Sequence, residues 1–222
     1  MSLKLWKTVD RYMEGLLIPP DAVLDAALEA SAAAGLPEIA VTPSQGKLLY
    51  LLAKMRGAQR ILEIGTLGGY STIWMARALA AKGRLVTLEA EKKHAAVARK
   101  NIARAGLSEV VDLRLGRALR TLPKLAAEGA APFDFVFIDA DKENTAEYFA
   151  WALRMSRPGT AIVVDNVVRE GEVAPSRTTD ASVQGIRKFN EAVAIEPRIS
   201  ATTIQTVGSK GYDGFTLALV LS

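Results

Sequence analysis

Two kinds of hydrophobic pattern alternate along most of this chain. Short apolar runs, typical of buried parallel strands, occupy residues 61–64, 84–88, 110–115, 133–138 and 160–164. Between them, at residues 71–79, 92–105, 118–128 and 144–155, apolar positions recur every three or four residues, as in amphipathic helices. Because parallel neighbouring strands need crossover helices, this alternation predicts an α/β fold with a doubly wound, mostly parallel sheet.

Both ends of the chain add elements to this alternation. Residues 3–17, 22–34 and 43–55 are predicted to form three helices, the third beginning at Thr42 as its cap and Pro43. After the fifth strand come a polar loop at 167–181, long enough to be a lid, and a helix at 182–194. Residues 200–207 and 215–221 then read as an antiparallel strand pair around a loop at 208–214, which completes a seven-stranded sheet. We expect one domain, with accessory helices at 1–57 and the α/β core at 58–222.

A glycine turn at residues 65–69 joins the first strand to the next helix. Such a turn exposes backbone to a ligand, but Leu67 breaks the dinucleotide pattern and Glu63 would repel a pyrophosphate. S-adenosylmethionine (SAM), which carries an ammonium group and no phosphate, fits better. Glu89, at the end of the next strand, is placed to accept hydrogen bonds from ribose hydroxyls. Alternatively, Glu63 could be a buried acid paired with a backbone amide, and Glu89 could be a neighbour of a helix N-cap. The presence of both acids at the expected places favours cofactor binding.

Oxygen-bearing side chains follow two neighbouring strands of the predicted sheet. Asp139 comes directly after the strand at 133–138, and Asp165 and Asn166 follow the strand at 160–164. Three such oxygens suit Mg²⁺, or less specifically Mn²⁺ or Ca²⁺. Lys142 could act as a general base toward a metal-bound hydroxyl. The residues alone leave open a helix cap at Asp139, a simple turn at 165–166 and a surface lysine at 142.

Composition narrows the class of protein. The 222 residues include no cysteine, which excludes disulfides, thiolate metal sites and a cysteine nucleophile. No apolar run approaches the length of a membrane span and no signal-like start is evident, so we expect a cytoplasmic protein without membrane contact. The net charge of +4 leaves a nucleic-acid partner open without indicating one. His94, the only histidine, is expected to be exposed on its helix.

Four motifs together resemble one enzyme family. LEIGTLGGYS, TLEAE, FIDADK and VVDNVVR occur in the order and spacing of the cation-dependent class I SAM O-methyltransferases. This family contains catechol and caffeoyl-CoA O-methyltransferases and many small bacterial relatives. The resemblance covers nearly the whole chain, including VDRYMEGLLIPPD, VTPSQGKLL and QTVGSKGYDGFTLAL.

The resemblance implies a set of site residues. It implies cofactor contacts at Val41, Glu63, Gly65, Thr66, Ser71, Glu89, Ala118 and Asp139. It further implies metal ligands at Asp139, Asp165 and Asn166, with Lys142 as the catalytic base beside Asp139. The chain departs from the family pattern at Arg117, where an acid is usual next to the adenine, at Thr145 and Ala146 in place of Tyr-Pro, and at Thr160 in place of Gly.

The expected reaction is metal-assisted methyl transfer from SAM to a hydroxyl of a small phenolic acceptor, catechol-like or of hydroxycinnamoyl type, by a homodimer. Two alternatives stay open: methylation of a hydroxylated base in RNA, and a SAM-binding module without catalysis. A nicotinamide oxidoreductase is disfavoured by Leu67 and Glu63.

Overall fold

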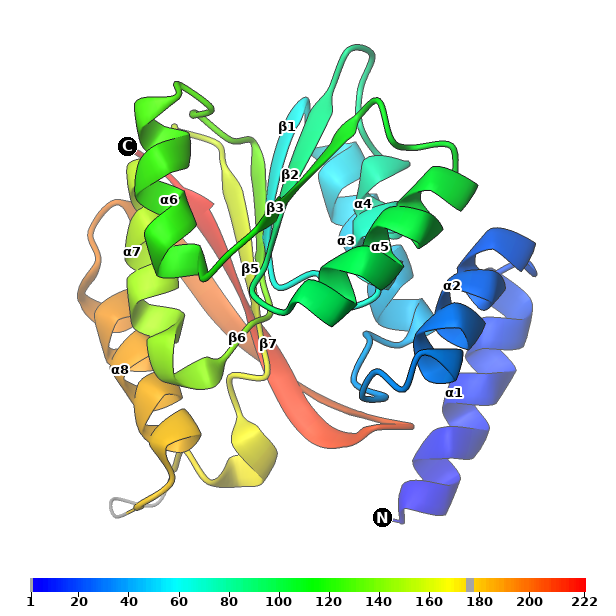
Figure 1. The fold of residues 1–222 in the computed structure, drawn as a ribbon. Coiled ribbons are helices and arrows are strands. Elements are labelled where there is room, and N and C mark those ends of the chain that lie inside the picture. The colour runs from blue at the N-terminus through cyan, green and yellow to red at the C-terminus, as the bar shows by residue number, and fades with distance from the viewer. Residues whose placement is uncertain (1, 175–177) are drawn as a thin grey trace.

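A seven-stranded sheet forms the centre of the protein, seen in a computed structural model that describes residues 2–174 and 178–222 (Figure 1). The strand order is β3-β2-β1-β4-β5-β7-β6. The five strands from β1 to β5 pair in parallel, whereas β7 is antiparallel to both β5 and β6. The strands are β1 (Arg60–Ile64), β2 (Arg84–Glu89), β3 (Val111–Leu115), β4 (Phe135–Ile138), β5 (Ala161–Asp165), β6 (Ile199–Gly208) and β7 (Gly211–Val220). The predicted fold class is confirmed.

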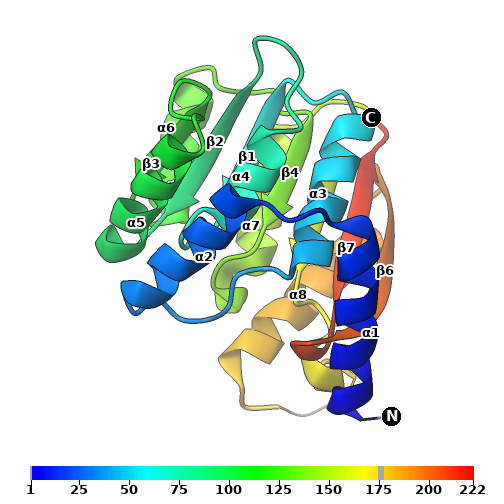
Figure 2. The ribbon, with the colours of Figure 1, turned by 90° about the vertical axis from the view of Figure 1, so that its right-hand side faces the viewer.

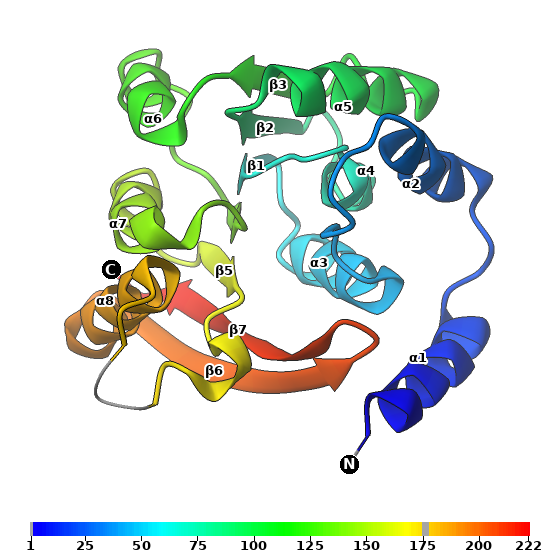
Figure 3. The same ribbon diagram turned by 60° about the horizontal axis from the view of Figure 1, so that its bottom comes forward.

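Helices cover both faces of the sheet. Figure 3 shows α6, α7 and α8 on one face and α3, α4 and α5 on the other, with α1 and α2 outside the second layer. The helices are α1 (Leu3–Leu17), α2 (Ala22–Ala33), α3 (Pro43–Met55), α4 (Tyr70–Ala76), α5 (Lys92–Arg104), α6 (Ala118–Ala127), α7 (Thr145–Arg154) and α8 (Ala181–Ile195), with short 3-10 turns η1 (Lys142–Asn144) and η2 (Arg169–Gly171). None of the helices in the described residues is long and apolar enough to cross a membrane.

Side-chain alternation along the strands divides the core into two clusters. Leu62 packs with Phe149 on the face covered by α6, α7 and α8. Ile61 points to the opposite face and packs with Ile73 under α4. Full burial of each such side chain contributes about 1.5–3 kcal/mol. Glu63 shares the face of Ile61, which places a carboxylate in the layer under α4.

The third helix begins as predicted. The Thr42 hydroxyl accepts the Gln45 N–H at 3.2 Å, and Pro43 occupies the first turn, where a missing N–H costs nothing. The cap stabilises the first turn of α3, whose Gln45 reaches Asp165 at the carboxyl end of β5.

The C-terminal hairpin differs from the prediction. The loop expected at 208–214 is wrong, because the strands continue to Gly208 and Gly211, which pair directly. Polar and glycine residues at 212–214 read as a loop in sequence, yet their backbone pairs with β6. The hairpin tip contacts the N-terminal region, where Asp10 Oδ2 accepts the Ser209 N–H at 2.5 Å and Lys210 donates to the carbonyl of Ala40. Figure 2 shows α1 alongside this end of the hairpin.

The predicted helix at 71–79 is shorter in the structure and ends at Ala76, with a turn at residues 77–78. The predicted loop at 167–181 contains η2, and α8 begins at its last residue. Residues 175–177 of this loop lie outside the described residues.

Candidate active site

A cavity of about 900 Å³ opens at the carboxyl ends of the parallel strands. This is the end of a doubly wound sheet where ligands gather. Most of the site residues predicted from the sequence line it: Val41, Gly65, Thr66, Ser71, Glu89, Ala118, Asp139, Lys142 and Asn166. Arg117, the main departure from the family pattern, lines it as well. Glu63 and Asp165 are not among the lining residues.

The glycine turn after β1 is shaped by two neighbours. Gly65 has a φ of 101°, and a Cβ built on it would lie 2.0 Å from the carbonyl oxygen of Asp139, so only glycine fits. Leu67 adopts a φ of 50°, an uncommon value for a side chain of its size. The Glu89 carboxylate compensates by accepting the N–H groups of Thr66 at 3.2 Å and Leu67 at 2.7 Å. Glu89 therefore both holds the turn and faces the cavity.

Glu63 lies behind the cavity wall. Its carboxylate is fully buried and accepts hydrogen bonds from the hydroxyls of Ser71 at 2.6 Å, Thr72 at 2.5 Å and Thr87 at 2.6 Å. Burial raises its pKa from 4.5 to about 7, against the effect of these three donors. The direct cofactor contact stays a prediction, because the structure places Ser71 in the cavity wall and Glu63 behind it.

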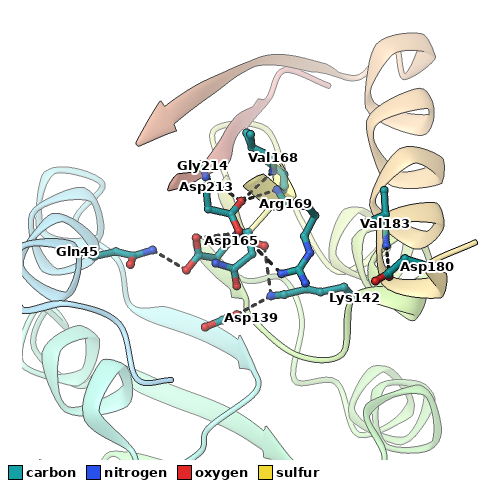
Figure 4. A network of polar contacts seen from close by, with 12 residues as sticks. Gln45, Asp139, Lys142, Asp165, Val168, Arg169, Asp180, Val183, Asp213 and Gly214 are labelled. Carbon is teal, nitrogen blue, oxygen red and sulfur yellow. Dashed lines mark hydrogen bonds and ion pairs between the residues drawn. The ribbon is translucent and has the colours of Figure 1, made fainter. Parts of the chain in front are cut away.

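The acidic residues that follow β4 and β5 come together with one lysine (Figure 4). Lys142 Nζ donates to Asp139 Oδ1 at 2.7 Å and to the backbone carbonyl of Asp165 at 3.3 Å. The other side of Asp165 meets α3, where Gln45 Nε2 donates to Asp165 Oδ2 at 2.6 Å. Burial and the Asp139 charge raise the pKa of Asp165. Asn166 has a φ of 58°, and within the described residues its side chain makes no hydrogen bond.

These residues fit a hard divalent cation. The carboxylates of Asp139 and Asp165 lie close together beside Lys142, partly shielded from water. Repulsion by the Asp139 charge is, after burial, the second cause of the raised Asp165 pKa. Asp139, Asp165 and Asn166 supply oxygen donors of the kind that Mg²⁺ prefers. Among the described residues no group of three His, Cys, Asp or Glu side chains could bind a metal. The Asn166 amide and water would therefore have to complete the coordination.

The position of Lys142 depends on one glycine of α8. A Cβ on Gly185 would lie 2.3 Å from the Lys142 carbonyl oxygen and 2.6 Å from Glu143 Cα. Only a glycine allows α8 to pack this closely on η1, the turn that carries Lys142. The sequence showed no signal for this contact, because α7, β5 and a polar loop separate the two segments along the chain.

Three further residues at the site were not predicted from the sequence to belong to it. Gln45 and Arg169 belong to segments already expected near the site, but nothing in their residue types marked them. The expectation for His94 is wrong: its side chain is 22% exposed, lines the cavity and lies 3.6 Å from Glu89 Oε1. The helical pattern placed it beside charged residues, whereas the turn before α5 directs it toward the strand end.

Known proteins share both the sequence and this geometry. A family model described as O-methyltransferase matches residues 20–221. The chain belongs to the O-methyltransferase family. This confirms the sequence-based prediction of a SAM-dependent O-methyltransferase.

Individual relatives of this O-methyltransferase match over their full length. A catechol O-methyltransferase of Niastella koreensis is 54% identical over 220 residues, which is 99% of this chain and 100% of the relative. The crystal structure of an O-methyltransferase from Bacillus cereus in complex with SAH has a TM-score of 0.97 and 57% identity, covering 99% of this chain and 100% of the other. The O-methyltransferase TomG from Streptomyces achromogenes, in complex with SAM, has a TM-score of 0.96 and 53% identity with both chains fully covered.

Proposed function

We propose that this enzyme transfers the methyl group of SAM to a hydroxyl of a catechol-type acceptor. A divalent cation would bind at the acidic rim, by which we mean Asp139, Asp165 and Asn166 at the ends of β4 and β5. The observation that carries the proposal is the contact between the two halves of the site. Gly65 of the turn lies against the backbone of Asp139, and the carboxylate of the same residue accepts a hydrogen bond from Lys142. A donor at the turn and an acceptor at the rim would therefore be neighbours. The relative from Niastella koreensis, a catechol O-methyltransferase, supports this acceptor class.

The proposed site residues have two roles: some would bind the cation, and Lys142 would transfer the proton. A cation held by Asp139, Asp165 and Asn166 would supply Lewis-acid polarisation of the acceptor hydroxyl, which lowers its pKa. Lys142 is the base of this proposal: its Nζ takes the hydroxyl proton, and the deprotonated oxygen then attacks the sulfonium methyl in line. The new O–C bond forms as the S–C bond breaks, and SAH leaves with the electron pair of that bond. In the structure Lys142 Nζ donates to Asp139, and the ammonium must first lose one proton so that its electron pair can accept the proton of the hydroxyl. Alignment of the reacting groups can contribute about 7–11 kcal/mol.

The acceptor class is tested with matched phenols. Initial rates with labelled SAM would be measured for catechol, its 1,3-dihydroxy isomer and phenol, together with a hydroxycinnamoyl thioester and a hydroxylated RNA. Adjacent hydroxyls can both reach one cation, so we expect catechol to exceed its isomer by at least about 100-fold in kcat/KM. Equal rates for the two isomers, or methylation of the RNA alone, would overturn the proposal.

The cation is tested without turnover. Mn²⁺ binding followed by electron paramagnetic resonance should give one site in the wild type, weakened at least about 10-fold in Asp165→Asn. Asp112→Asn, a change of an exposed carboxylate on β3, is the matched control. The assignment fails if Asp165→Asn and Asp112→Asn bind the ion equally well.

We further propose that the enzyme is a homodimer joined through α1. No residue of α1 is buried, and Leu5, Val9, Tyr12 and Leu16 are between 48% and 65% exposed. Their spacing of four, three and four residues is that of a coiled-coil seam, which a second copy of the same helix can match by two-fold symmetry. A lone helix face of this kind would otherwise leave a large apolar patch in water.

Sedimentation velocity at micromolar concentration tests the dimer. The double variant Tyr12→Glu and Leu16→Glu should shift a dimer to a monomer, while Lys7→Glu, an exposed change off the stripe, should not. A monomeric wild type would remove this part of the proposal and leave the acceptor chemistry unaffected.

A further inference from the structure

Arg169 lies at the acceptor side of the cavity in an unusual backbone conformation. It begins η2, four residues after Asp165, and both Arg169 and Glu170 have positive φ, at 52° and 57°. Non-glycine residues in this region cost about 1–3 kcal/mol each unless their surroundings hold them. Asp213 of β7 does so, because its Oδ1 accepts the N–H groups of Val168 and Arg169, each at 2.9 Å. The turn is fixed, and the Arg169 side chain lines the cavity.

The guanidinium of Arg169 has hydrogen-bonding capacity left over. Its ion pair with Asp213 is 3.9 Å long, beyond hydrogen-bond distance, since the carboxylate mainly serves the backbone of the turn. Arg169 Nε is buried and has no hydrogen-bond partner within the described residues. A buried donor on a charged group is costly when it is left unpaired. These observations indicate an anionic acceptor atom that arrives with a ligand.

The position of Arg169 tells which ligand this is. Figure 4 shows its guanidinium beside Lys142, the residue that contacts Asp139 and Asp165, and both Arg169 and Lys142 line the cavity. The glycine turn and Glu89, predicted to hold the donor, lie at the carboxyl ends of β1 and β2. An anionic group near Arg169 would therefore belong to the acceptor. One forked guanidinium pairs with a planar carboxylate through two parallel hydrogen bonds.

Resting on the proposed function, we propose that Arg169 binds a carboxylate of the acceptor, so that the preferred substrates are catechols that carry an acidic side group. The same positive charge disfavours catechols with an ammonium group. Arg169 then determines which catechols are preferred, whereas the cation-binding residues and Lys142 act on the hydroxyls that all catechols share.

A charge series of acceptors tests this inference. Initial rates would be measured for 3,4-dihydroxybenzoate, catechol and 4-(2-aminoethyl)catechol, with wild type, Arg169→Gln and Arg169→Lys. We expect Arg169→Gln to lower kcat/KM for the benzoate by about 10- to 100-fold and for catechol by less than about threefold. For the amine it should stay equal or rise. Arg169→Lys should restore part of the loss, because it keeps the charge without the fork.

Binding measurements keep the test independent of turnover. Calorimetry would give the affinity of the SAH-loaded protein for 3,4-dihydroxybenzoate, and of the free protein for SAM. Arg198→Gln is the matched control, because this guanidinium is paired with Glu196 on the surface. Selective loss of benzoate affinity in Arg169→Gln supports the inference.

Three results would overturn the inference. These are an equal loss for all three acceptors, a loss of SAM affinity, and no change at all. Wild-type inactivity on every catechol would instead refute the proposed function, and the benzoate affinity would still decide the function of Arg169.

Discussion

The buried carboxylate of Glu63 makes the stability of this enzyme depend on pH in a predictable direction. Burial raises its pKa in the folded protein from 4.5 to about 7. Between these two values the unfolded chain loses the proton while the folded protein keeps it. The contribution of Glu63 to the free energy of unfolding is therefore fully present below pH 4.5 and is lost as the pH rises through 7. At about 1.4 kcal/mol per pH unit, the full difference is about 3 kcal/mol.

Glu63→Gln should remove this pH dependence. The amide has nearly the same shape and is neutral at all pH values, and the surrounding hydroxyls can rotate to donate or accept. Among them, Thr66 and Thr87 share a hydrogen bond in which either can be the donor. Between pH 5 and pH 8 we expect the wild type to lose about 2–3 kcal/mol of unfolding free energy relative to the variant.

Urea denaturation at both pH values, followed by circular dichroism, measures this difference directly. Glu109→Gln, at an exposed position, is the control and should keep the wild-type pH dependence. Identical pH dependence in the wild type and Glu63→Gln would refute the reasoning. Titration of SAM into the same variant also tests the predicted cofactor contact: a loss beyond about 10-fold would place Glu63 on the ligand, since a charged hydrogen bond contributes about 1.5–3 kcal/mol.

Three other substitutions test the site. Lys142→Met should lower kcat at least about 100-fold while calorimetry shows a SAM affinity within about threefold of wild type; a kcat near wild type would exclude the lysine from proton transfer. Gly185→Ala should lower the unfolding free energy by about 1–3 kcal/mol and reduce kcat, because its Cβ would meet the Lys142 carbonyl at 2.3 Å, whereas Gly15→Ala, with nothing within 4 Å, should do neither. Glu89→Gln weakens the acceptor of the Thr66 and Leu67 N–H groups and should reduce SAM affinity about 10-fold by calorimetry; an unchanged affinity would remove Glu89 from donor binding.

Local patterns were enough to predict the sheet, because each strand and its crossover helix are continuous in sequence. The glycine turn was predictable for the same reason, as was the meeting of Asp139 with Asp165, since neighbouring parallel strands end at one edge. The hairpin was misjudged at residues 212–214, where pairing with β6 outweighs the local turn preference.

Contacts between distant segments were beyond local reasoning. Gln45 meets Asp165 across 120 positions, and nothing near either residue encodes that hydrogen bond. Arg169 ends the VVDNVVR motif, but its contribution to the site could not be predicted, because its unpaired Nε and its fixed backbone depend on the fold around Asp213 of β7. The burial of Glu63 behind Ser71 likewise required the position of α4.

The contacts at the tip of the C-terminal hairpin have a consequence for synthesis of the chain. Asp10 and Ser209 are 199 positions apart, and Lys210 reaches the Ala40 carbonyl across 170 positions. On the ribosome, the sheet from β1 to β5 can assemble while these partners are still untranslated. The segment around Ala40, next to Val41 in the cavity wall, then acquires its anchor only after Ser209 and Lys210 have been synthesised. The nascent enzyme would therefore reach binding competence only once the hairpin of β6 and β7 has formed, however early the rest of its core has folded.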